Sequence, residues 1–532
     1  MTEPSTVAAP RQPDPNRWWT LLAVCLGTFM LLLDITIVNV ALPDIQASLG
    51  STFSDLQWVV DAYALTLASL LLTSGSLADM YGRRRLFLVG LVVFTGASVL
   101  CGAAASSLML ELSRALQGIG GAVMFSVSLA LLANAFRGRE RGTAFGVWGA
   151  VTGVAVAVGP VLGGALVSGF SWRAIFFVNV PLGVAAVVLT MARVAESRER
   201  RGTAPDWPGF ACFTAGLASL VFALIEAGRT SFGDTTVLVC FGLSALLLAA
   251  FLLVEMRSDH PMFDLGLFRL PTFSGGAVAA FGISAGLFSM LLYLVLYLQD
   301  VLGYSAFATG LRLLVLSGSI LAVSGLAGRL TSHVPVRALI GVGLVLVGVG
   351  LLLMRGLQAS STWTHLIPGL VVAGIGAGMV NPPLASTAVG VVPPQRAGMA
   401  SGINSTFRQV GIATGIALLG TLFSTRLTSA VTALVTGTPL AGHGDRIATA
   451  LRGGQAGRLF HSAHSRTELA ALRHVARAGF TTALDLIMLV AAILSIVAGV
   501  AAFVLIRGRD FSEDLGAATS GPAAPAGEEA AV

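Results

Sequence analysis

Apolar segments of 19 to 28 residues recur along most of this chain, separated by short polar stretches. A helix of that length, at about 1.5 Å per residue, covers the ~30 Å hydrocarbon core of a bilayer. Helices also satisfy their backbone hydrogen bonds without water. The pattern therefore predicts an all-α integral membrane protein with 14 transmembrane helices. The expected spans are 18–41, 57–78, 86–105, 108–134, 143–168, 174–193, 207–227, 236–256, 273–298, 308–328, 337–355, 364–391, 401–425 and 480–506.

The composition supports lipid as the solvent for most of the surface. The chain is 55% hydrophobic and 11% charged, and its mean hydropathy is +0.85. Soluble domains carry about 25% charged residues, so a soluble fold is excluded. The pI of 9.7 does not indicate a nucleic-acid partner, because the arginines are concentrated in the loops between spans.

All 32 of the residues counted as Lys or Arg are Arg. Without Lys, the chain cannot supply a standard Walker A loop or a Lys Schiff base. Cysteines 25, 101, 212 and 240 lie singly in apolar runs, without metal-ligand spacing. We therefore expect no enzyme activity, no metal and no cofactor, and active transport would have to use an ion gradient or a partner subunit.

The arginines are divided unevenly between alternate loops. The N-terminal tail, every second loop and the C-terminal end hold most of them, whereas the intervening short loops hold only Arg173, Arg229 and Arg355. By the positive-inside rule, both termini are expected in the cytoplasm of a bacterial cell, with the spans in its cytoplasmic membrane. Segment 426–479 is an exception, because it holds seven Arg on the expected outer side.

A weak internal repeat divides the chain. SGSLADMYGRRRL (74–86) follows the second span, and SGLAGRLTSHVPVRAL (324–339) follows the tenth. This predicts two six-helix bundles with two inserted linker helices and a substrate site between the halves. The expected divisions are a cytoplasmic tail at 1–17, the first bundle at 18–194, the linker helices with their loops at 195–270, the second bundle at 271–507 with a long outer segment at 426–479, and a disordered tail at 508–532.

Three charged residues interrupt the expected spans: Asp34 in the first, Asp61 in the second and Arg114 in the fourth. A charge at such a depth costs roughly 2.5–3.5 kcal/mol on insertion scales, so each needs a cavity or a partner. Counted from the outer ends of their spans, they lie about 10, 6 and 9 Å deep. Two acids and one base in one layer can pair and exchange with a proton; a purely structural ion pair is the alternative.

Two further motifs contain glycines at positions that favour close packing. In GSLADMYGRRR (75–85), Gly75 allows close helix approach and Gly82 makes the turn, with Asp79 and Arg83 on the cytoplasmic side. In GAVTGVAVAVGPVLGG (149–164), the glycines, which include Gly159 and Gly163, give the fifth span a smooth face, and Pro160 kinks it.

Taken in order, these segments resemble the major facilitator superfamily, specifically its fourteen-span drug:proton antiporters of the EmrB/QacA type. The resemblance covers about residues 18–425 and 480–506. The segments that carry it are LDITIVNVALP (33–43), GSLADMYGRRR (75–85), RALQGIGGA (114–122), GVAVAVGPVLGG (153–164), SWRAIFFVNVPLG (171–183) and GMASGINSTFRQVG (398–411).

The resemblance implies a major facilitator fold and proton-coupled export of lipophilic drugs, with Asp34 and Arg114 in proton-coupling roles. Asp61 is similar to the acid found in exporters of quaternary ammonium compounds, so it favours cationic drugs and is a candidate for binding either drug or proton. The expected partners are small lipophilic or cationic drugs, protons and membrane lipid, and the chain is expected to act as a monomer. Two alternatives stay open: a dedicated exporter of one endogenous antibiotic or metabolite, and a proton-symporting importer.

Other residues are weaker candidates for substrate binding. Asn381, beside Pro382 and Pro383, indicates a broken helix that lines the cavity. Aromatic side chains can form a pocket for an organic cation, although packing or lipid contact explains them equally well. The aromatic candidates are Trp58, Tyr63, Trp148, Phe281, Phe288, Tyr293 and Tyr297.

Overall fold

The computed structural model describes the chain except residues 1–14, 52, 137, 198–205, 258–262, 264, 332, 394–395, 437–441, 453–459, 461–464 and 512–532. In this described part, every regular element is a helix. Thirteen helical segments are long and apolar enough to span a membrane. The fourteenth expected span is α5, which has 32 residues and packs between α1 and α12. The all-α membrane fold expected from the apolar segments is therefore confirmed.

The first half of the chain forms six spans. Two of them, α2 and α3, pack on α4, while α1 packs on α5 and α7. Ser106 begins α4 as an N-cap, because its hydroxyl accepts a hydrogen bond from Met109 N at 3.3 Å. The helices are α1 (Arg17–Leu49), α2 (Phe53–Tyr81), α3 (Arg83–Gly102), α4 (Ser107–Ala135), α5 (Gly138–Gly169), α6 (Ala174–Phe177) and α7 (Asn179–Arg193), of which the last two form one span.

Two helices, α8 (Trp207–Arg229) and α9 (Thr235–Arg257), follow the first half and pack against each other. Of the two, α8 also contacts α2 from the first half and α15 (Ala397–Val435) from the second. The inserted pair thus adjoins the boundary between the halves. The exact residue limits expected for the bundles and linker remain predictions.

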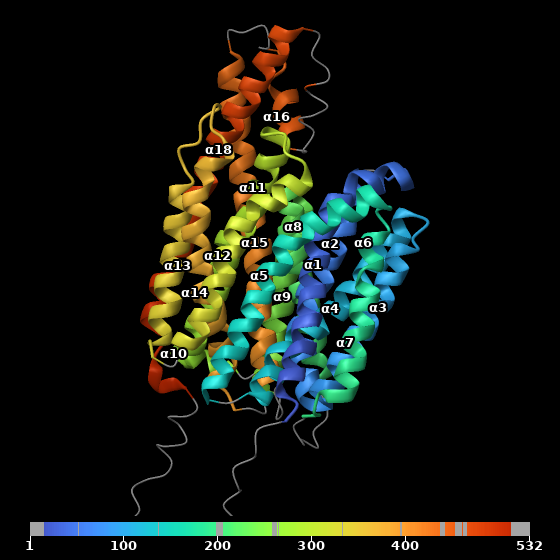
Figure 1. Cartoon of the computed structure of the whole chain (residues 1–532), viewed down its shortest axis with the longest axis vertical. Coiled ribbons are helices and arrows are strands. Elements are labelled where there is room, and N and C mark those ends of the chain that lie inside the picture. Colours follow the sequence, from blue (N-terminus) through green and yellow to red (C-terminus); the bar gives the residue numbers. More distant parts are fainter. Residues whose placement is uncertain are drawn as a thin grey trace, which may run out of the picture.

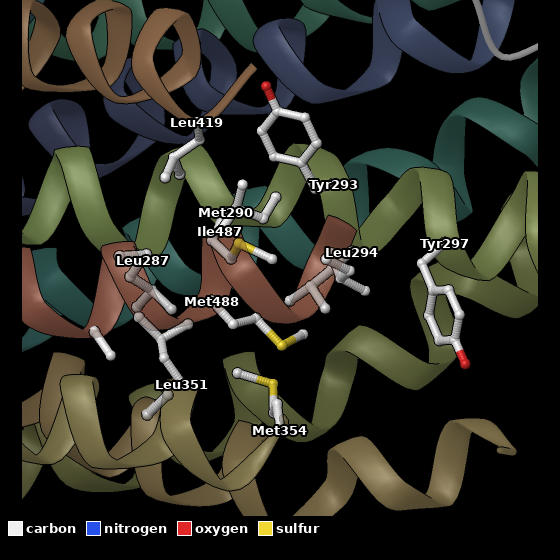
Figure 2. Close-up of a cluster of buried hydrophobic side chains, with 14 of the residues drawn as sticks. Leu287, Met290, Tyr293, Leu294, Tyr297, Leu351, Met354, Leu419, Ile487 and Met488 are labelled. Atoms are coloured by element: carbon white, nitrogen blue, oxygen red, sulfur yellow. The ribbon is translucent and has the colours of Figure 1, made fainter. Parts of the chain in front are cut away.

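The second half begins with the short helix η1 (Leu265–Arg269) and packs around a large apolar core (Figure 2). Leu287, Met290 and Leu294 meet side chains from α13, α15 and α18 there. Within the first span of this half, η2 and η3 are π-helical segments. The helices are α10 (Pro271–Ile283), η2 (Ser284–Phe288), α11 (Ser289–Leu296), η3 (Tyr297–Val301), α12 (Ala306–Leu330), α13 (Val336–Leu353), η4 (Trp363–Leu366), α14 (Ile367–Gly390), α15, α16 (Gly444–Arg452), α18 (Arg466–Leu505) and η6 (Gly508–Asp510).

The helix break expected at Asn381 is absent, because α14 continues through Pro382 and Pro383. A proline removes the hydrogen bond to the carbonyl four residues earlier, but neighbouring hydroxyls can satisfy that carbonyl in a membrane helix. Here Ser324 Oγ of α12 donates to Gly378 O at 3.4 Å. Packing of α14 against α12 and α13 holds the helix on both sides.

The long segment at 426–479, for which the sequence suggested no structure, is largely helical where it is described. With 39 and 40 residues, α15 and α18 are about 60 Å long and continue beyond the other helices, where α16 packs against both (Figure 1). We call this part the outer extension: α15 from 426, α16, and α18 up to 479. The opposite end of the molecule, where α1 begins and α18 ends, is called the inner face.

Candidate functional site: a buried ion pair and a contact between the halves

Asp34 of α1 and Arg114 of α4 form an ion pair inside the first half. Arg114 Nη1 donates to Asp34 Oδ2, and the two residues are 0% and 1% exposed. Arg114 Nε also donates to the carbonyl of Val59 in α2 at 3.0 Å. The predicted pairing of an acid and a base in this layer is thus present. It compensates two charges that would each be costly alone in a membrane.

Three amide and hydroxyl side chains complete the environment of Asp34. Gln117 Nε2 and Asn179 Nδ2 both donate to Asp34 Oδ1, at 2.8 and 3.0 Å. Gln117 Nε2 also donates to Ser98 Oγ at 2.8 Å. We call Asp34, Arg114, Gln117, Asn179 and Ser98 the Asp34 cluster; its members come from α1, α3, α4 and α7. The Asp34 carboxylate therefore accepts hydrogen bonds from three side chains on two helices, α4 and α7.

Sequence reasoning placed Gln117 on the face of Arg114 but assigned no role to Ser98 or Asn179. Both are uncharged residues in otherwise apolar spans, at 0% exposure. The signal that could have found Asn179 is its position in SWRAIFFVNVPLG, where an amide stands alone in an apolar stretch. A buried amide needs hydrogen-bond partners, so an unpaired Asn in a span predicts a polar neighbour.

Tyr63 of α2 joins the ion pair from another side. The Arg114 guanidinium carbon lies 4.2 Å from the centre of the Tyr63 ring, which is a cation–π contact, and Tyr63 is 2% exposed. The structure therefore places Tyr63 against the Arg114 guanidinium, and not in a pocket with the other aromatic candidates.

Asp61 is separate from the Asp34 cluster. It is partly exposed, and Arg114 directs its hydrogen bonds to Asp34, Gln117 and Val59 instead. One helical turn away on α2, Trp58 stacks on Phe222 of α8, with ring centres 6.0 Å apart. Of the two acids expected in one layer with Arg114, Asp34 forms the buried ion pair with it, whereas Asp61 lies outside the Asp34 cluster.

The remaining aromatic candidates do not form one pocket among the described residues. Trp148 donates from Nε1 to Thr28 Oγ1 at 3.1 Å in the first half. Tyr293 donates to the carbonyl of Ile416 at 3.1 Å, and Tyr297 stacks on Phe480. Phe288 packs at the edge of the core of the second half. Each side chain has a packing partner of its own, which is the alternative that the sequence left open.

Asn381 lies at the boundary between the halves and is 2% exposed. Its Oδ1 accepts a hydrogen bond from Arg408 Nη2 of α15 at 2.7 Å. A Cβ atom added to Gly149 of α5 would lie 3.6 Å from the Asn381 Cβ. Although the helix is not broken there, the structure brings Asn381 to the contact between α14 and α5.

A polar contact joins the halves at the inner face. Asp79 Oδ1 accepts a hydrogen bond from Arg83 Nη2 at 2.7 Å, and from Gly398 N at 3.0 Å. Its Oδ2 accepts one from Met399 N at 2.8 Å. Because Gly398 and Met399 are in the first turn of α15, an acid of α2 caps a helix of the other half. We call Asp79, Arg83, Gly398 and Met399 the inner-face contact.

Glycines allow the backbones to meet at this contact. A Cβ at Gly75 would overlap the Gly398 carbonyl, and one at Gly142 of α5 would overlap the Gly328 carbonyl of α12. Gly82, at φ 112°, forms the turn between α2 and α3, where a side chain would be strained. A Cβ at Gly82 would also meet the carboxylate of Glu196 at 2.8 Å.

The glycine-rich face of α5 packs on α1 next to Asp34, on the side away from the inner face. A Cβ at Gly159 would overlap the Thr36 hydroxyl and lie 2.7 Å from its Cβ, and one at Gly163 would lie 2.9 Å from Ile37 Cγ1. The smooth face expected for this span is therefore occupied by α1. The side chain of Pro160 lies outside the described residues.

These features define a polytopic membrane protein with a buried ion pair in one half and a polar contact between two halves. Residues 24–416 match the family model described as the Major Facilitator Superfamily. The chain belongs to this superfamily, whose members are transporters and not enzymes.

Relatives with curated descriptions are drug-resistance and export proteins of bacteria. The chain is 38% identical over 411 residues to "Multidrug resistance protein Stp" of Mycobacterium tuberculosis, which covers 77% of this chain and 76% of that protein. It is 38% identical over 433 residues to "Puromycin resistance protein pur8" of Streptomyces alboniger, covering 80% of this chain and 86% of that protein. The "Tetracenomycin C resistance and export protein" of Streptomyces glaucescens is 35% identical over 432 residues, covering 80% of each.

A solved structure has the same fold at low sequence identity. The human organic anion transporter MFSD10 covers 91% of this chain and 100% of its own, with a TM-score of 0.60 at 16% identity. The relatives and the fold together show a multi-span transporter of the type that exports drugs and antibiotics.

Proposed function

We propose that this protein exports lipophilic, mainly cationic drugs from the bacterial cytoplasm in exchange for protons, with the inner face toward the cytoplasm. The observation that carries the proposal is the Asp34–Arg114 pair, which lies in a membrane span and is sealed from solvent. A buried pair is stable only while both partners keep their charges. A proton on Asp34 would remove one charge and weaken the attraction to Arg114.

The ion pair is placed so that its protonation can affect helix packing. Asp34 is two residues before Thr36, which fills the groove at Gly159 of α5. In turn, α5 packs along α12 of the other half. A change at Asp34 would therefore reach the boundary between the halves through one helix. The inner-face contact would have to open for drug to enter from the cytoplasm.

The proton gradient supplies enough energy for this exchange. Moving one charge is worth about 2.3 kcal/mol per 100 mV of membrane potential, and each pH unit adds about 1.4 kcal/mol. One proton can therefore sustain an outward gradient of a neutral drug of about two orders of magnitude. Asp61 and Trp58 are proposed to contact the drug, because Asp61 is partly exposed and Trp58 lies one helical turn away on α2.

The test is uptake of ethidium into inverted membrane vesicles that contain the protein. An acidic lumen should drive ethidium inward, and an ionophore that collapses the proton gradient should stop uptake. Asp34→Asn should abolish uptake at equal protein levels. Uptake that is independent of the gradient would contradict proton coupling.

A dedicated exporter of one compound is a second candidate, since some relatives are described by a single antibiotic. A panel of unrelated drugs would separate the two proposals: resistance to one compound alone would favour the dedicated exporter.

A further inference from the structure

Like Arg114 and Arg312, Arg408 is an arginine in the membrane region, and no acid among the described residues compensates it. It is 11 residues from the start of α15, so it lies about 17 Å from the inner end of that helix. Its hydrogen-bond partner is the neutral Asn381, through Nη2 to Oδ1 at 2.7 Å. Among the described residues, no carboxylate is within ion-pair distance of Arg408. Arg114, by contrast, has Asp34.

An uncompensated cation at that depth is unfavourable, because little water is available to solvate it. Proteins retain such a charge when it faces a cavity or meets an anion during function. Asn381 lowers this cost only in part, since a neutral amide oxygen provides one hydrogen bond for a guanidinium with five N–H groups. The missing partner of Arg408 is therefore an acceptor with negative charge.

Two serines on the same face of α15 also lack hydrogen-bond partners. Ser401 and Ser405 are 0% and 1% exposed, and their hydroxyls have none in the structure. With Arg408 they follow the i, i+4, i+7 spacing of one helix face. Buried serines elsewhere use the carbonyl four residues earlier, as Ser98 does with Phe94 O at 2.8 Å and Ser128 with Met124 O at 2.7 Å. Ser401 and Ser405 leave their hydroxyls available.

The face lies inside the protein and is not turned toward lipid. No residue of α15 from Ala397 to Ser424 is exposed, because helices of both halves surround it. Residues from Ala397 to Thr406 are fully buried, and partial exposure begins at Phe407 and includes Arg408. Arg408 thus lies where the buried first part of α15 gives way to partly exposed residues.

We infer that Arg408, with Ser405 and Ser401, binds a carboxylate or other acidic oxygen group of the exported drug. This inference rests on the proposed drug export, but it assigns a substrate class of its own: lipophilic acids and zwitterions. A guanidinium can donate two parallel hydrogen bonds to a carboxylate. The hydroxyl of Ser405, one helical turn away, can donate to the same anion, and Ser401 continues the polar face by one more turn. The acid would meet Arg408 in the second half, and a cationic group would meet Asp61 in the first.

The experiment compares three fluorescent probes of one scaffold: pyrenebutyrate, its methyl ester and pyrenebutylamine. Transport is measured in inverted vesicles, and binding is measured by fluorescence with the purified full chain. Arg408→Gln should weaken binding and transport of the carboxylate about 10- to 100-fold, the range of a lost charge-assisted hydrogen bond. The ester and the amine should change little, and Arg408→Lys should restore part of the carboxylate binding.

Arg312→Gln is the matched control, because Arg312 of α12 is also in a span but lies 3.6 Å from the ring centre of Tyr304 and donates to Ala308 O. It should leave the ratio of carboxylate to ester unchanged. Equal loss of all three probes in Arg408→Gln would assign Arg408 a structural role and overturn the inference. Wild-type protein that binds the ester and the amine but not the carboxylate would also overturn it.

The same measurements distinguish a failure of the proposed export from a failure of the proposed anion site. If no probe is transported while the carboxylate still binds in an Arg408-dependent way, the proposed export is wrong and the anion site stands. If ethidium and the amine are transported but Arg408→Gln has no selective effect on the carboxylate, export stands and the anion site is wrong.

Discussion

Asp79 and Met399 are 320 positions apart in the chain, yet Asp79 Oδ2 accepts a hydrogen bond from Met399 N at 2.8 Å. Asp79 lies in the last turn of α2 in one half, and its carboxylate caps the first turn of α15 in the other half. Glu196 provides the same chemistry without crossing the boundary, because it accepts hydrogen bonds from Arg84 N and Arg85 N at the start of α3. Both acids therefore cap a helix, but only Asp79 also joins the two halves.

Asp79→Asn should open the inner face. The substitution removes the charge that faces the first turn of α15, and with it the ion pair to Arg83. The loss of a cap is worth about 0.5–2 kcal/mol, or roughly 2- to 30-fold in the closed-to-open ratio. Spin labels at Ala192→Cys and Arg337→Cys, in a chain without the native cysteines, should report longer distances by electron paramagnetic resonance. Glu196→Gln should leave that distance distribution as in the parent; an equal shift in both variants would contradict the role of Asp79.

Arg114→Ala should abolish export although the protein still inserts. Removing one partner of a buried pair costs about 3–5 kcal/mol, since Asp34 is left charged or must bind a proton permanently. Drug resistance of expressing cells and the melting temperature of the purified protein would measure the two effects. The double variant Asp34→Asn with Arg114→Gln should recover much of the stability but not the export. Resistance at the wild-type level in Arg114→Ala would eliminate the coupling role.

Gly159→Leu should block transport, because the new side chain would occupy the position of Thr36 on α1. Overpacking of this kind typically costs 1–3 kcal/mol, and drug binding should survive better than transport. Thr36→Gly in the same chain should relieve part of the defect. Gly96→Leu is the control, because no atom lies within 4 Å of a Cβ at Gly96. Normal pumping by Gly159→Leu would mean that the contact with α1 is passive packing.

Asp61→Asn should reduce export of a dication more than that of a monocation, and leave a neutral drug nearly unchanged. Each positive charge of a drug adds its own attraction to the acid in a medium of low dielectric constant. Asp34→Asn should instead reduce export of all three. Minimum inhibitory concentrations for one compound of each charge decide between the roles. A loss that is equal for the three compounds would make Asp61 a proton carrier.

The sequence was sufficient for the spans and for the Asp34–Arg114 pair, because charges in apolar helices require partners and helical spacing places them in one layer. It was not sufficient for the partners of Asn179 and Ser98, because a lone polar residue in a span predicts a polar neighbour but does not identify it until α3 and α7 are packed on α1 and α4. Asp79 was recognised as the end of α2, but its partners are backbone groups of α15. A backbone N–H has no signature in the sequence, so only the fold could reveal that contact.

The helix break that was expected at Asn381 also shows that one helix read alone is not sufficient to predict its structure. Two consecutive prolines predict a break when α14 is considered alone, and the hydroxyl of Ser324 that compensates Gly378 comes from another helix. Likewise, the arginines of segment 426–479 concealed a periodic apolar pattern that becomes a core only when α15, α16 and α18 are brought together.

The outer extension gives the second half an arm that continues beyond the ends of the other helices. Because α15 and α18 each continue from the core into it without interruption, any tilt of their membrane parts moves its tip through a larger arc than any point inside the bundle. The same α15 carries the inner-face contact at its first turn and Arg408 at mid-depth. A fluorophore at an exposed residue of the arm, such as Arg473, would therefore follow the opening of the opposite face, from the extracellular side in the proposed orientation, with the transport path left untouched.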